Sequence, residues 1–138
     1  MNHELSKIAD WRHTALQLLP ELAEEIREAE TPYLLWIDLR LVFEAAYRSL
    51  PLEDSLIQRI YQFGRWCFSQ PRGKSAEDDL LTCVFVCFFE HIPDCKAALD
   101  DVTRWLSSDD FAVLEGVFKE TMTKKSFLSL STHFHKCL

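Results

Sequence analysis

The chain has 138 residues, 48% hydrophobic and 27% charged, which is enough for one globular domain with a buried core. Its net charge of −7 repels phosphate backbones, so nucleic-acid binding is not expected, whereas a basic partner suits it. Only three glycines are present, so turns that need positive φ are scarce and a hairpin-rich β fold is not expected.

Helix signals recur along the whole chain, where apolar stripes begin after a proline, an N-cap residue or a pair of acids. Thr31 and Pro32, for example, form an N-cap followed by a first-turn proline, while Pro51 precedes the acidic start Glu53 and Asp54. These signals and the helical periodicity predict seven helices. They span residues 4–18, 20–30, 32–49, 53–69, 77–92, 94–106 and 108–122.

The segment 77–92, EDDLLTCVFVCFFEHI, is the most apolar of the seven, since between Leu80 and Phe89 only Thr82 is polar. Its apolar side chains cover every direction of a helical wheel, which indicates a helix buried on all sides. The run is shorter than the roughly 20 apolar residues that span a bilayer, so no membrane helix is expected. We expect this helix at the centre of the domain.

The connections between the predicted helices are short, which forces neighbouring helices to run antiparallel. We therefore predict an all-α, single-domain fold of about seven antiparallel helices. The pairs 32–49/53–69 and 77–92/94–106 resemble stacked HEAT-like hairpins around the buried helix. The helical domain is predicted to span 1–122, followed by a tail over 123–138 in which one further short helix is an option.

The five cysteines are odd in number, and two of them, Cys83 and Cys87, fall in the apolar run. This pattern indicates reduced thiols in a cytosolic protein. The first residues, MNHELSKIADWRH, lack the basic start and apolar stretch of a signal peptide. We expect a cytoplasmic location and no membrane partner.

Four segments together resemble a family of uncharacterised bacterial helical domains. They are LLPELAEEI (18–26), PYLLWIDLRLVFEAAY (32–47), IQRIYQFGRWCF (57–68) and LLTCVFVCFFEHI (80–92). The resemblance implies a small HEAT-like bundle, and some members resemble immunity proteins of polymorphic toxin systems. It implies no catalytic activity, and it places Asp38 and Glu90 where the family pattern tends to carry acids.

Three polar residues stand out within apolar segments: Asp38, and the sequence neighbours Glu90 and His91. Asp38 shares its side of the helical wheel with apolar neighbours, so we predict that it is buried, with Arg59 as its ion-pair partner. The alternative for Asp38 is a polar contact point inside a groove. Glu90 and His91 end the buried helix, where an acid needs a compensating partner. Two interpretations stay open: a buried structural cluster of these four residues, or a small enzyme with an acid–His cleft formed by Asp38, Glu90 and His91.

Two groups of side chains have a weak metal-ligand pattern. Cys83, Cys87 and His91 lie at i, i+4 and i+8, and a second group comprises His133, His135 and Cys137. Zinc accepts thiolates and imidazoles, but the short Cys-x-x-Cys spacing of many zinc sites is absent from the sequence. We therefore expect neither a metal nor a cofactor.

The segment 20–30 is strongly negative because it carries Glu21, Glu24, Glu25 and Glu28. These acids either serve solubility or form a docking face for a basic protein. We expect a non-catalytic protein-binding domain, of the immunity type that the resemblance implies, with a basic protein as partner. A small enzyme and a structural helical scaffold module stay as alternatives.

Overall fold

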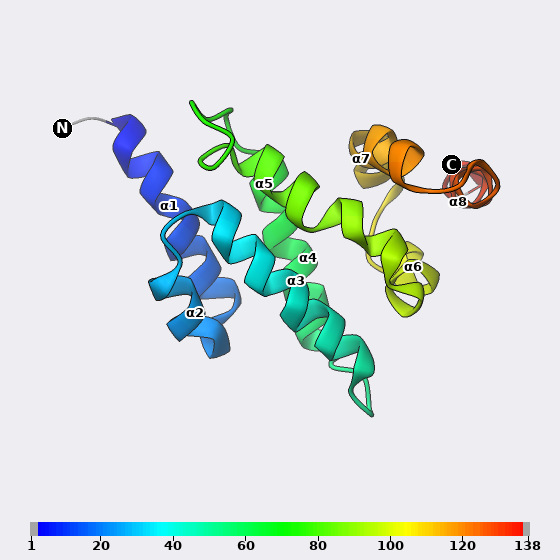
Figure 1. Cartoon of the computed structure of the whole chain (residues 1–138), viewed down its shortest axis with the longest axis horizontal. Coiled ribbons are helices and arrows are strands. Elements are labelled where there is room, and N and C mark those ends of the chain that lie inside the picture. Colours follow the sequence, from blue (N-terminus) through cyan, green and yellow to red (C-terminus); the bar gives the residue numbers. More distant parts are fainter. Residues whose placement is uncertain (1–2, 137–138) are drawn as a thin grey trace.

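The computed structural model describes residues 3–136, and these form eight α-helices without a β-strand among them (Figure 1). The helices are α1 His3–Leu18, α2 Ala23–Glu28, α3 Pro32–Arg48, α4 Asp54–Phe68, α5 Leu80–Cys87, α6 Lys96–Asp101, α7 Ser108–Thr121 and α8 Lys124–Lys136. Three 3₁₀ segments, Pro20–Leu22, Phe89–Asp94 and Val102–Arg104, join some of them. The predicted all-α fold is therefore confirmed.

Helices α3, α4 and α5 form the middle of the molecule, with α1 and α2 at one end and α7 and α8 at the other (Figure 1). The α3–α4 connection over residues 49–53 turns the chain back on itself, so that α4 runs antiparallel to α3. Helix α5 packs against both α3 and α4. The 3₁₀ segment Phe89–Asp94 then carries the chain to α6 and packs against α7.

Local sequence signals set several helix starts where they were predicted. The Thr31 hydroxyl accepts a hydrogen bond from the Leu34 amide over 3.2 Å, and Pro32 is the first residue of α3. At α7 the Ser107 hydroxyl accepts from the Asp110 amide over 3.1 Å, and the Asp110 carboxylate accepts from the Ser107 amide over 2.9 Å. This reciprocal capping box satisfies two backbone groups that the first turn leaves without a helical partner.

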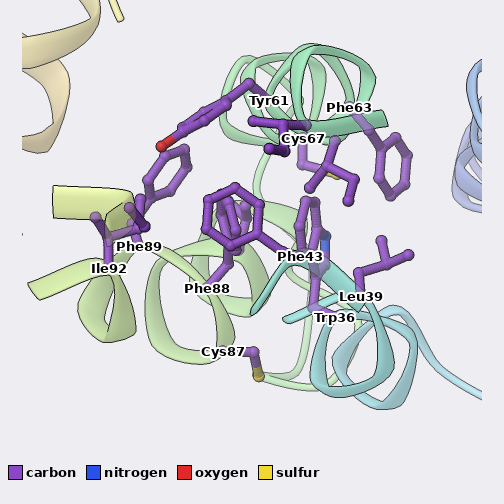
Figure 2. Packing of buried hydrophobic residues seen from close by; sticks show 14 of the residues in the cluster. Trp36, Leu39, Phe43, Tyr61, Phe63, Cys67, Cys87, Phe88, Phe89 and Ile92 are labelled. Carbon is purple, nitrogen blue, oxygen red and sulfur yellow. The ribbon is translucent and has the colours of Figure 1, made fainter. Parts of the chain in front are cut away.

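Aromatic side chains from α3, α4 and the end of α5 fill the centre of the core (Figure 2). The ring of Phe88 lies 4.7 Å from that of Phe43, 5.1 Å from that of Trp36 and 5.7 Å from that of Tyr61, measured between centroids. All four side chains are buried, and their tilted or edge-to-face packing suits the quadrupoles of the rings.

The prediction of one helix over 77–92, buried on all sides, is wrong in its length and in its burial. Helix α5 has eight residues, Leu80–Cys87, and the chain continues as a 3₁₀ helix over Phe89–Asp94, past the predicted end at residue 92. Val86 is 38% exposed, and Phe85 is partly buried. Helices α3 and α4 pack against α5, and they leave Val86 partly exposed.

The C-terminal segment forms a longer helix than was expected. Helix α8 packs against α7, and the rings of Phe111 and Phe134 stack with their centroids 4.6 Å apart. Phe127 and Leu130 of the same helix are also buried. Within the described part of the chain, no helix has the combination of length and apolarity needed to cross a membrane.

Candidate functional site

Two arginines hold helix α2 and the 3₁₀ segment before it against their neighbours. The Arg12 guanidinium donates hydrogen bonds to the backbone carbonyls of Ile26 and Ala29, at the end of α2. Arg59 of α4 donates to both carboxylate oxygens of Glu21 over 2.7 Å and to the Leu18 carbonyl over 3.0 Å. This arrangement is a two-pronged ion pair, and it holds the pKa of Glu21 below its usual value. The Glu21 carboxylate is therefore already paired within the chain.

An open groove of about 390 Å³ lies between α2 and the first half of α3. Its apolar lining is provided by Ala29, Leu34 and Ile37. Four carboxylates also line it, those of Glu25, Glu28, Glu30 and Asp38. Among the side chains of residues 11–135, no lysine, arginine or histidine forms an ion pair with any of these four acids. We call this site the acidic groove.

The outer face of α3 extends the apolar part of the acidic groove along the helix. Leu34 is 46% exposed and Leu41 is 53% exposed, and Ala45 is exposed as well. Leu34 and Leu41 lie seven residues apart, about two helical turns, so both are on the same side of α3. The groove and this face together expose apolar side chains and carboxylates on one side of α3.

The prediction that Asp38 is buried and paired with Arg59 is wrong. Asp38 is exposed on the outer face of α3, and Arg59 pairs with Glu21 instead. The helix is apolar around most of its circumference, so the apolar pattern alone did not define the inward side. The aromatic residues Trp36 and Phe43 define it, because they pack into the core and leave Asp38 on the opposite side.

The structure does not bring Asp38 together with Glu90 and His91. Asp38 lines the acidic groove, whereas His91 lines a narrow crevice beside Arg40 and Glu44. The His91 Nδ1 atom lies 3.5 Å from a carboxylate oxygen of Asp94, and Glu90 is partly buried. The four residues of the predicted polar cluster therefore lie at separate places, and the predicted cluster does not form.

Two of the four predicted partner-binding acids line the acidic groove. Glu25 and Glu28 do so, while Glu24 is exposed but is not part of the lining. Glu21 is engaged by Arg59. The helical spacing of the acids over 20–30 was sufficient to find the group, but only the packing of α2 on its neighbours shows which carboxylates stay available.

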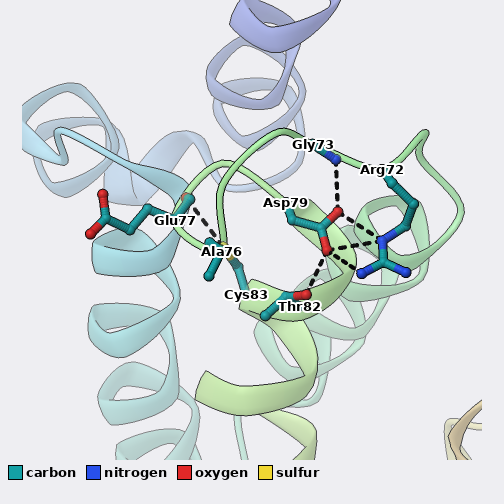
Figure 3. Close-up of polar contacts among 7 residues, drawn as sticks. All are labelled: Arg72, Gly73, Ala76, Glu77, Asp79, Thr82 and Cys83. Atoms are coloured by element: carbon teal, nitrogen blue, oxygen red, sulfur yellow. Dashed lines mark hydrogen bonds and ion pairs between the residues drawn. The ribbon is translucent and has the colours of Figure 1, made fainter.

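Asp79 is the buried carboxylate that sequence reasoning missed (Figure 3). It accepts hydrogen bonds from the Arg72 guanidinium over 2.7 Å, from the Gly73 amide over 2.9 Å and from the Thr82 hydroxyl. The Arg72 guanidinium, together with these donors, holds the pKa of Asp79 well below its usual value. The side chain ties the 70–79 loop to the start of α5, and its position directly before an apolar run was the available signal.

A second polar cluster, around Asp101, joins α3 to the segment that follows α6. The Asp101 carboxylate accepts hydrogen bonds from the Tyr47 hydroxyl over 2.7 Å and from the Trp105 indole over 3.0 Å. Arg104 bridges Asp101 and Asp54, with N–O distances of 3.0 and 2.6 Å. Burial, together with the hydrogen bond to Asp101, raises the pKa of Tyr47. We interpret this cluster as structural.

The thiol of Cys83 faces backbone carbonyls rather than other ligand groups. Its Sγ atom lies 3.4 Å from the carbonyl oxygens of Ala76 and Glu77, and burial raises its pKa to about 12 (Figure 3). No group of three or more His, Cys, Asp or Glu side chains in the described residues is placed to hold a metal ion. Cys137 of the second metal pattern lies outside the described residues.

We expect the buried thiols to resist modification in the folded protein. With a pKa of about 12, only about one Cys83 side chain in ten thousand is a thiolate at pH 8, and the thiolate is the reactive form. A Cys95→Ser/Cys137→Ser variant retains Cys67, Cys83 and Cys87, all of which are buried. Titration with an aromatic disulfide reagent should label these three thiols only after denaturation. Rapid labelling of the folded variant would contradict the expectation.

No protein-family model matches the chain, and neither a curated protein nor a solved structure shows significant similarity to it.

Proposed function

We propose that the chain is a non-catalytic protein-binding domain that receives a basic segment of another protein in its acidic groove. The observation that carries the proposal is a set of four carboxylates that line the acidic groove beside apolar side chains and have no ion-pair partner among residues 11–135. They are those of Glu25, Glu28, Glu30 and Asp38. Lysine or arginine side chains of a partner would supply the missing counter-charges while apolar contacts supply affinity.

The kind of binding that we propose is that of an immunity protein, which neutralises a cognate bacterial toxin by covering part of its surface. The sequence segments 18–26, 32–47, 57–68 and 80–92 resemble a family of bacterial helical domains, some members of which resemble immunity proteins, and this resemblance is the basis of the proposal. A cytoplasmic location and a HEAT-like pairing of α3 with α4 belong to the same proposal. Such a complex needs no catalytic group on this chain.

Charge steering should make association with the partner sensitive to salt. The chain carries −7, and attraction between exposed charges is screened beyond about 10 Å at 0.1 M salt. The association rate measured by stopped flow should therefore fall as salt rises from 0.05 to 0.5 M, in buffers chosen for the test. An acidic partner, or association rates indifferent to salt, would contradict the electrostatic part of the proposal.

Reversal of two groove charges is the direct test. Glu25→Lys/Glu28→Lys should slow association with the basic partner about tenfold or more, because it replaces attraction by repulsion at the groove itself. The matched control Glu115→Lys/Glu120→Lys makes the same charge change on exposed positions of α7. The partner is first isolated from the producing host by affinity capture, with the groove variant as the negative control, and is identified by mass spectrometry. Equal effects of the two variants would contradict a role of the groove.

A further inference from the structure

The outer face of α3 carries a straight row of exposed residues. The row consists of Leu34, Asp38, Leu41, Ala45 and Arg48, all of them exposed. Their spacing alternates between four and three residues, which is the spacing that keeps side chains on one seam along a helix. Helix α3 has 17 residues, so the seam runs along most of its length.

This seam is complementary to itself when it is read in the opposite direction. Helix α3 of a second copy can lie antiparallel to the first, in the register in which the numbers of two facing residues add up to 86. In this register Leu41 faces the partner's Ala45. In the same register Asp38 faces the partner's Arg48. A large side chain thus meets a small one and an acid meets a base, and two-fold symmetry repeats each contact.

We propose that the chain forms a two-fold symmetric dimer through antiparallel pairing of α3 with α3 of a second copy. Neither Asp38 nor Arg48 has an ion-pair partner among the described side chains of its own chain. Antiparallel pairing supplies both partners, whereas parallel pairing in register sets Asp38 against Asp38 and Arg48 against Arg48. Repulsion between like charges therefore selects the antiparallel form.

Exposed leucines extend the seam at its ends. The helical register ends at Arg48, beyond which the connection between α3 and α4 carries Leu50 and Leu52. Leu50 of that connection is 95% exposed and Leu52 is 40% exposed. A pair of five-turn helices buries less than the roughly 1,200 Å² of a stable interface, so the loop leucines are needed and the dimer is weak.

Self-pairing goes beyond the proposed function, because it uses the seam rather than the whole groove. The seam and the acidic groove share Leu34 and Asp38. A second copy and a basic partner therefore exclude one another at this surface. Arg48 and Ala45 do not line the groove, so substitutions there report on self-pairing separately.

Sedimentation velocity of the full chain between 1 and 200 μM, a range chosen for the test, decides the proposal. The wild-type chain should shift from monomer to dimer with rising concentration. Asp38→Arg and Arg48→Glu should each weaken association at least tenfold, because each sets like charges against one another. The combined variant Asp38→Arg/Arg48→Glu should restore association to within about threefold of the wild type, because the pair is then exchanged rather than lost. Leu41→Asp, at the centre of the seam, should abolish the dimer.

Circular dichroism shows whether each variant is folded, and the exposed Glu115→Lys variant controls for the change of net charge in Asp38→Arg. A wild-type chain that stays monomeric at 200 μM would overturn the proposal. So would a combined variant that associates no better than the two single variants. A monomeric chain that still captures a basic partner would contradict self-pairing and leave the proposed function standing. A dimer that captures no basic partner would support self-pairing and contradict the proposed function.

Discussion

Replacing Phe88 by alanine is expected to lower the free energy of unfolding by about 3–5 kcal/mol, the usual cost of removing a fully buried phenylalanine ring. Phe88 is 1% exposed, and its ring contacts those of Trp36, Phe43 and Tyr61. The change therefore leaves a cavity between three helices, and the surrounding rings are too rigid to fill it. Denaturant titration with an unchanged m-value is the measurement.

Phe85→Ala is the matched control, because it removes the same kind of ring from α5, three residues before Phe88. Phe85 is only partly buried, so its removal should cost about 1–2 kcal/mol. Equal losses from the two variants would mean that both sides of α5 are covered in solution. A loss below about 1 kcal/mol for Phe88→Ala would mean that α5 is not at the centre of the core.

Replacing Asp79 by alanine is expected to lower the free energy of unfolding by about 2–4 kcal/mol, because it removes the acceptor for several hydrogen bonds at once. The Gly73 amide and the Thr82 hydroxyl lose their partner, and the 70–79 loop is released from α5. Arg72→Ala should cost less, since the Arg72 side chain is 68% exposed and leaves the other two contacts intact. Equal losses from the two variants would contradict this account.

The stability that Asp79 provides should depend on pH in a defined direction. Its pKa is held below the usual value of 3.8 in the folded protein. The contribution is therefore fully present above pH 5 or so, where the carboxyl group is ionised in both states, and it is lost as the pH falls toward the lowered pKa. Comparison of the wild type with Asp79→Asn by denaturant titration between pH 7 and pH 3 is the measurement. The difference between the two proteins should shrink on acidification, and a difference independent of pH would contradict it.

The helical content and most helix starts could be predicted from the sequence, because they depend on neighbouring residues. The Thr31 cap, the first-turn Pro32 and the Ser107 cap all act within one turn of helix. The acids of α2 were likewise found as a group. The ion pair of Glu21 could not be predicted, since its partner Arg59 lies 38 residues away in the chain.

The tertiary structure decided which sides of the apolar helices face the core. Helix α3 is apolar around most of its circumference, so periodicity could not distinguish the buried side from the side that carries Asp38, Leu41 and Ala45. Packing of Trp36 and Phe43 against Phe88 makes that choice, and it leaves the opposite side exposed. The same reason explains α5, whose sequence is apolar on all sides but which other helices cover on some sides only. The burial of a side of a helix depends on which other helices pack against it, and not on the apolarity of the helix itself.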